Sequence, residues 1–142
     1  MKKLLVMFLT MLTSMLVFAH APLLDVTDNN DGYVYIEGGY SNGEDATGTE
    51  IWVIENKNYN GSEEVYNGKL VIFHGYLEKG AQLKLPKPKI SKYIVVFDGG
   101  PGHELEKKGP KLTKDEMAAW EKAIATDTKL GKWKDKWLGK VK

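Results

Sequence analysis

The chain has 142 residues, with 20 lysines, no arginine, 19 acidic residues and no cysteine. Because positive and negative charges nearly balance, the composition argues against nucleic acid as a partner. The absence of cysteine excludes disulfide bonds and a cysteine nucleophile, so stability must come from packing or from a bound ion. Residues 20–100 carry 7 lysines and 12 acidic residues, whereas residues 101–142 carry 11 lysines and 7 acidic residues. The body of the chain is therefore acidic and its C-terminal part basic.

Residues 1–19 have the features of a secretory signal peptide. Lys2 and Lys3 precede an uncharged apolar run from Leu4 to Phe18, and the small residue Ala19 follows. The apolar run is too short for a comfortable membrane span. We expect the mature protein to be released into the periplasm or another extracellular, cell-envelope space.

Signal cleavage would create a new N-terminus, and we expect it at His20. Cleavage after Ala19 exposes His20, whereas cleavage after Ala21 would put Pro22 directly behind the cut bond, where proline makes a poor substrate. A free N-terminal histidine offers its α-amine and its imidazole to one metal ion. One further imidazole would complete a three-nitrogen set that suits Cu(II) or Ni(II). The alternative is that cleavage leaves a histidine with no role.

Residues 20–110 predict a mainly β domain, a small antiparallel sandwich of immunoglobulin-like or transthyretin-like type. Short β-branched and aromatic runs alternate there with clusters of turn residues, and no window of helical periodicity survives the glycines. The expected strands are Tyr33–Glu37, Glu50–Glu55, Lys69–Tyr76, Ala81–Leu85 and Lys92–Asp98.

Two features of residues 20–110 have both a structural and a functional interpretation. Asp28 to Gly32 resembles the start of a calcium loop, but the twelfth place, Gly39, lacks the required glutamate, so we predict a hairpin turn. Strand alternation puts His74 on one face with Leu70 and Ile72. His74 is either a hydrogen-bonded core or edge residue, or a metal ligand.

The last expected strand of the body ends in Asp98-Gly99-Gly100-Pro101-Gly102-His103. Pro101 and Gly102 suit the two central positions of a type II turn, because proline fixes the first φ and glycine accepts a positive second one. The turn would present His103, either as a solvated side chain or as a ligand, with Asp98 able to orient an imidazole.

With its expected N-terminal His20 and this Gly-Pro-Gly-His103 ending, the chain resembles the small secreted accessory subunits of ECF-type nickel and cobalt transporters. The resemblance covers roughly residues 20–110 and is most specific at the turn. It implies that His20 and His103 bind the ion before it passes to the membrane transporter subunits.

Residues 111–142 predict a helical, basic tail. Thr113 and Glu116 have the spacing of a capping box, and Met117, Trp120 and Ile124 form one helical stripe. Further on, Leu130, Trp133, Trp137, Leu138 and Val141 alternate with six lysines at near-helical spacing. In one interpretation this segment contacts an anionic membrane surface or an acidic partner. In the other it docks on its own domain and leaves its lysines in solvent.

Together these features predict an exported, non-enzymatic protein that captures a transition-metal ion for a membrane transporter. Ni(II) or Co(II) is the expected cargo, with Cu(II) as the alternative; His20 and His103 are the expected ligands and His74 a further one. Neutral imidazole is required for binding, so affinity should fall below about pH 6. The alternatives are a structural or adhesive envelope sandwich without metal, and a copper-dependent oxygenase, which the small body disfavours.

Overall fold

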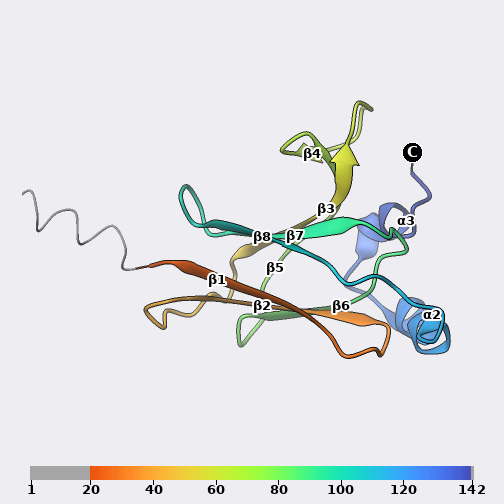
Figure 1. The fold of residues 1–142 in the computed structure, drawn as a ribbon, viewed down its shortest axis with the longest axis horizontal. Helices are drawn as coiled ribbons and strands as arrows, with labels where there is room; N and C mark the ends of the chain where they lie inside the picture. Colours follow the sequence, from red (N-terminus) through yellow and green to blue (C-terminus); the bar gives the residue numbers. More distant parts are fainter. Residues whose placement is uncertain (1–19, 142) are drawn as a thin grey trace, which may run out of the picture.

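The computed structural model describes residues 20–141. The predicted signal peptide, residues 1–19, lies outside the described residues. Two antiparallel sheets pack face to face, as Figure 1 shows, and a short helical region follows them. The predicted β-sandwich with a C-terminal helical tail is confirmed.

The smaller sheet has the strand order β1-β2-β6 and the larger one the order β4-β5-β3-β7-β8, with every neighbouring pair antiparallel. The strands are β1 (Pro22–Asp28), β2 (Tyr33–Tyr40), β3 (Glu50–Asn58), β4 (Val65–Tyr66), β5 (Lys69–Tyr76), β6 (Gln82–Pro86), β7 (Tyr93–Asp98) and β8 (Glu104–Lys108).

All five expected strands are present, as β2, β3, β5, β6 and β7, and β2 and β3 run three residues further than expected. Three strands were not predicted. β4 has only two residues, and β8 reads Glu-Leu-Glu-Lys-Lys, a composition that is typical of a solvated loop. β1 begins at a proline and buries only Leu24, so the alternation that identifies a strand is weak there.

The predicted hairpin at residues 28–32 is confirmed, since it joins β1 to β2. Asn30 and Gly32 have positive φ, and the Asp28 carboxylate accepts a hydrogen bond from the Asn30 N–H at 2.8 Å. Asp31 accepts another from the Tyr33 N–H at 3.1 Å. The oxygen side chains of this loop therefore stabilise a turn.

The core lies between the two sheets, and β7 is its centre, with Tyr93 to Phe97 all buried. Its partner β3, and β5 on the far side of β3, contribute further buried β-branched and aromatic side chains. This explains why the run Tyr93–Asp98 has no polar alternation: both of its faces are covered.

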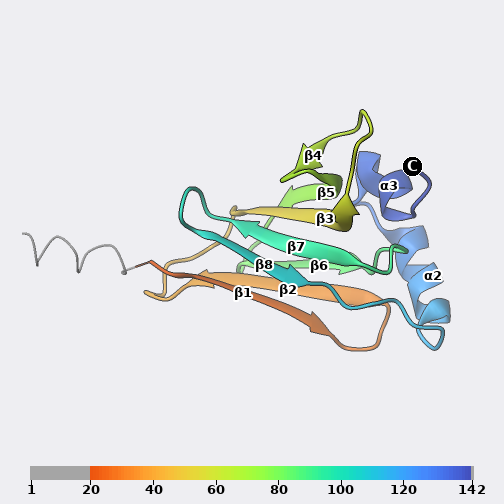
Figure 2. The ribbon, with the colours of Figure 1, turned by 45° about the horizontal axis from the view of Figure 1, so that its top comes forward.

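The tail consists of α2 (Met117–Thr126), the 3₁₀ turn η2 (Gly131–Trp133) and α3 (Lys134–Trp137). η2 and α3 contact β5, and α2 contacts β6. Leu130, Trp133 and Trp137 belong to the hydrophobic core, and the Trp137 indole donates to the Pro86 carbonyl oxygen at 3.0 Å. Figure 2 shows the helices at one end of the sandwich, so the tail completes the core of its own domain.

The predicted helix is present, but it begins at Met117 with Glu116 in the N-cap position, so Thr113 does not cap it as predicted. The Glu116 carboxylate accepts hydrogen bonds from the Thr113 N–H at 2.7 Å and from its hydroxyl at 2.9 Å. These contacts join the two residues of the predicted capping box, but they lie in the loop before α2 and not in its first turn. In the described range, 20–141, no helix has the length and apolarity needed to span a membrane.

Candidate functional site

The turn that carries His103 has the predicted form. The His103 N–H donates to the Gly100 carbonyl oxygen at 2.9 Å, and Gly102 has a φ of 79°, as a type II turn with Pro101 and Gly102 at its centre requires. The Gly99 N–H also donates to the His103 carbonyl oxygen at 3.0 Å. His103 is therefore held by its backbone at the end of the β7–β8 hairpin.

Tyr40, the last residue of β2, lies against this turn. Its ring is edge-on to the His103 ring, with centroids 6.3 Å apart, and edge-on to Phe97 at 5.6 Å. A Cβ at Gly99 would come within 2.6 Å of the Tyr40 hydroxyl oxygen. Glycine is needed at position 99 because Tyr40 occupies the space that a side chain would fill.

The chain beside His20 is anchored at the same end of the molecule. Its anchor is Ser41, the residue that follows β2, which bonds to Ala21. The Ser41 N–H donates to the Ala21 carbonyl oxygen at 2.8 Å, and the Ala21 N–H donates to the Ser41 hydroxyl at 3.1 Å. The His20 Nε2 lies 3.2 Å from a carboxylate oxygen of Glu44. Figures 1 and 2 both show the start of β1 and the β7–β8 turn at the end opposite to α2.

Two consecutive residues, Tyr40 and Ser41, contact His103 and the neighbour of His20. Ser41 fixes the residue after His20, and Tyr40 contacts the His103 ring. The His20 side chain is 47% exposed. Tyr40, Asp98 and Gly99 also border a hollow of about 320 Å³ beside β3. Sequence reasoning missed Tyr40, Ser41 and Glu44, because only the strand pairing brings residues 40–44 to the two histidines.

His74 lies elsewhere, on the outer face of the larger sheet. Its ring stacks on Trp52 with centroids 3.7 Å apart, and its Nε2 is 3.6 Å from a Glu50 carboxylate oxygen. That nitrogen is buried and has no hydrogen-bond partner. The His74 side chain contacts Trp52, Tyr76 and Glu50 and neither of the other histidines. The predicted alternation is interrupted in β5, because Val53 pairs with Phe73 and Ile54 with Val71. The structure groups His74 with Trp52 and Tyr76.

Asp98 also has partners other than a histidine. One carboxylate oxygen accepts a hydrogen bond from the Gly100 N–H at 3.0 Å, and the other accepts one from the Tyr66 hydroxyl at 3.2 Å. Burial raises the pKa of Tyr66, and the negative charges of Asp98, Glu104 and Glu106 raise it further. Asp98 therefore stabilises the turn and anchors Tyr66.

Across residues 20–141, no group of three or more His, Cys, Asp or Glu side chains is arranged to hold a metal ion. His20, His74 and His103 consequently do not form a three-histidine centre. A site at His20 and His103 would have two imidazoles, and its third nitrogen would be the α-amine that cleavage before His20 creates.

A second polar cluster, which the sequence did not reveal, is buried between the sandwich and the tail. Lys87 has no solvent exposure and bonds to Asp28 at 2.8 Å and to Glu116 at 2.5 Å. Burial alone lowers the pKa of Lys87, but its hydrogen bonds to the two carboxylates outweigh this and the pKa is raised. The charges compensate each other, which is typical of a structural ion pair rather than a ligand site.

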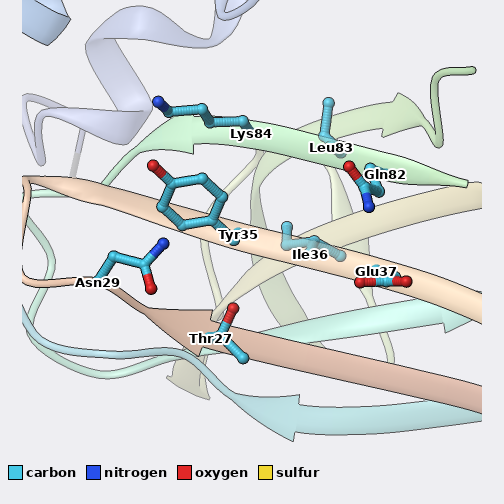
Figure 3. A pocket seen from close by; sticks show the side chains of 8 residues that line it. All are labelled: Thr27, Asn29, Tyr35, Ile36, Glu37, Gln82, Leu83 and Lys84. Carbon is cyan, nitrogen blue, oxygen red and sulfur yellow. The ribbon is translucent and has the colours of Figure 1, made fainter. Parts of the chain in front are cut away.

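The pocket in Figure 3 lies on the smaller sheet, where Tyr35 and Lys84 lie beside each other. It has a volume of about 240 Å³, and the Lys84 ammonium lies 3.9 Å from the centre of the Tyr33 ring. Its lining includes none of the three histidines. It is therefore separate from the end of the molecule that carries His20 and His103.

The chain is thus a two-sheet β-sandwich with a docked helical tail, in which Tyr40 contacts His103 and Ser41 bonds to Ala21, the neighbour of His20. Comparison with protein-family models, with curated proteins and with solved structures finds no match to this chain.

Proposed function

We propose that this chain is an exported carrier that binds a divalent transition-metal ion, Ni(II) or Co(II) in preference to Cu(II), and delivers it to a membrane metal transporter. The ion is the cargo. Its ligands are the imidazole and α-amine of His20, after signal cleavage, and the imidazole of His103.

The observation that carries the proposal is the common anchoring of the two histidines. Ser41 binds the residue behind His20 with two hydrogen bonds, and Tyr40 packs against the ring of His103. Anchoring both ligands to adjacent residues of one strand end reduces the conformational entropy that a bound ion must remove. An exposed site at the end away from the helices also leaves the ion accessible to a transporter.

The test is calorimetric titration of the mature chain, beginning at His20, with Ni(II), Co(II), Cu(II) and Zn(II). We expect dissociation constants tighter than about 1 μM, or a binding free energy beyond about −8 kcal/mol. Adding one alanine before His20, or replacing His103 with alanine, should weaken binding at least tenfold. His74→Ala should bind like the parent, because His74 lies in a different cluster.

Two results would overturn the carrier proposal. One is the absence of micromolar binding for all four ions. The other is binding that is unchanged when a residue precedes His20. Oxygen consumption in the presence of Cu(II) and a reductant would instead favour the copper oxygenase.

A further inference from the structure

The contact between His20 and Glu44 determines which nitrogen of the His20 ring carries a proton. An ionised carboxylate can only accept hydrogen bonds, so the nitrogen that faces it must be the donor. The nitrogen 3.2 Å from Glu44 is Nε2. In the neutral ring, Nε2 then carries the hydrogen and Nδ1 keeps its lone pair.

Nδ1 is also the nitrogen that the chelate requires. From the α-amine, the path to Nδ1 runs through Cα, Cβ and Cγ, and closing it on a metal ion gives a six-membered ring. Nε2 is one atom further away, on the opposite side of the imidazole, where it cannot close a small ring with the amine of the same residue. The contact with Glu44 therefore leaves the chelating nitrogen free.

His103 has the opposite arrangement. Its Nδ1 lies 3.2 Å from the carbonyl oxygen of Pro101, which is also an acceptor only. Nδ1 must therefore carry the hydrogen in the neutral ring, and Nε2 keeps the lone pair. A second-shell acceptor of this kind fixes the tautomer and the orientation of a metal-binding histidine.

The loop after β2 positions Glu44 for this contact. The Gly43 N–H donates to the Tyr40 carbonyl oxygen at 2.9 Å, and the Glu44 N–H donates to the Asn42 side chain at 3.2 Å. In the chain, this turn comes directly after Tyr40, which contacts His103, and Ser41, which bonds to Ala21.

We propose that Glu44 is a positioning residue of the metal site, one that holds His20 as the Nε2–H tautomer with Nδ1 directed to the ion, while His103 binds through Nε2. This inference rests on the proposed carrier function and adds to it the binding nitrogen of each ring.

The first test needs no metal. In the mature chain with ¹⁵N-labelled histidine, at about pH 8 where ordinary imidazoles are neutral, long-range ¹H–¹⁵N correlation spectra report the protonated nitrogen of each ring. We expect opposite tautomers, Nε2–H for His20 and Nδ1–H for His103. Glu44→Ala should return His20 to the tautomer mixture of a solvated histidine and leave His103 unchanged.

The second test is titration with Ni(II). Glu44→Ala should weaken binding about tenfold or more, the effect that loss of an outer-shell partner has at metal sites. Glu44→Gln, whose amide oxygen still accepts from Nε2–H, should recover most of the loss. Glu121→Ala, on the exposed side of α2, is the control and should match the parent in both tests.

The outcomes separate the two proposals. Equal tautomers at His20 and His103, or Ni(II) binding that does not respond to Glu44→Ala, would overturn the role of Glu44 while leaving the carrier function intact. Failure of the parent chain to bind Ni(II), Co(II), Cu(II) or Zn(II) would overturn the carrier function and, with it, the purpose assigned to Glu44.

Discussion

Lys87 has no exposed side-chain surface, yet it carries a charge that Asp28 and Glu116 compensate. Asp28 comes from the end of β1 and Glu116 from the residue before α2, so one ammonium connects the sandwich to the tail. Burying such a group without its partners costs several kcal/mol. The cluster therefore makes the position of the tail depend on ionisation.

This dependence has a definite direction. Burial alone raises the pKa of Glu116, but hydrogen bonds from Lys87 and Thr113 lower it from the ordinary 4.5 to about 2. A carboxyl whose folded-state pKa is lowered contributes stability above its unfolded pKa and loses it as the pH falls through the folded value. The contribution is present above about pH 4.5 and lost towards about pH 2.

Glu116→Gln should reduce the free energy of unfolding at pH 7 by about 3 kcal/mol, because it breaks a buried ion pair. The difference from the parent chain should shrink as the pH falls from about 4.5 to about 2. Urea unfolding followed by tryptophan fluorescence measures both. Glu121→Gln is the matched control. A difference in unfolding free energy between Glu116→Gln and the parent chain that stays constant with pH would contradict the lowered pKa of Glu116.

The β7–β8 turn depends on the end of β2 as well as on its own sequence. Gly99 is close to the Tyr40 hydroxyl, so an alanine there must displace the ring that packs on His103. We expect Gly99→Ala to cost about 1–3 kcal/mol of stability by overpacking and to weaken metal binding.

Tyr40→Phe in the same chain should recover part of this loss, because it removes the nearest of the three atoms that the new Cβ would meet; the other two, at 3.1 Å, are the His103 carbonyl oxygen and a Phe97 ring carbon. A double-mutant cycle should give a coupling of about 1 kcal/mol. Gly39→Ala is the control, since its Cβ would meet only Leu23 at 4.0 Å. Additive effects of Gly99→Ala and Tyr40→Phe would show that the two positions do not interact in this way.

How far sequence anticipates this structure differs between elements. The run at Tyr93–Asp98 and the Pro101-Gly102 turn were predicted because both depend on local preferences, β-branched packing and permitted φ values. β8 was not, because its charged residues join the sheet only through pairing with β7. His103 and His20 were predicted as ligands from their chemistry, whereas the contacts of Tyr40, Ser41 and Glu44 with these segments depend on the pairing of β1 with β2 and on the loop after it.

At the scale of the whole molecule, the tail is part of the core. Trp137 is fully buried, and its ring packs edge-on against Phe73 of β5 at 5.8 Å. The tail's basic, amphipathic pattern was compatible with a membrane-facing helix, but Leu130, Trp133 and Trp137 are directed into the sandwich. Any contact of this segment with a membrane or an acidic partner would have to use its lysines.

A chain that ends at Thr128 should lose much of its stability, because it lacks three core side chains, each worth about 2–5 kcal/mol when truncated. A chain that ends at Leu138 keeps all three and is the matched control. Thermal unfolding and binding of a hydrophobic dye compare the two. Equal melting temperatures would mean that the tail does not contribute to the core.

Trp137 follows strands β1 to β8 in the chain, and this order affects when the protein can fold. A core that is closed by residues 130–137 cannot be fully packed until the chain has been synthesised past them. Before that point, the surface between β5 and β6 that the tail covers remains open.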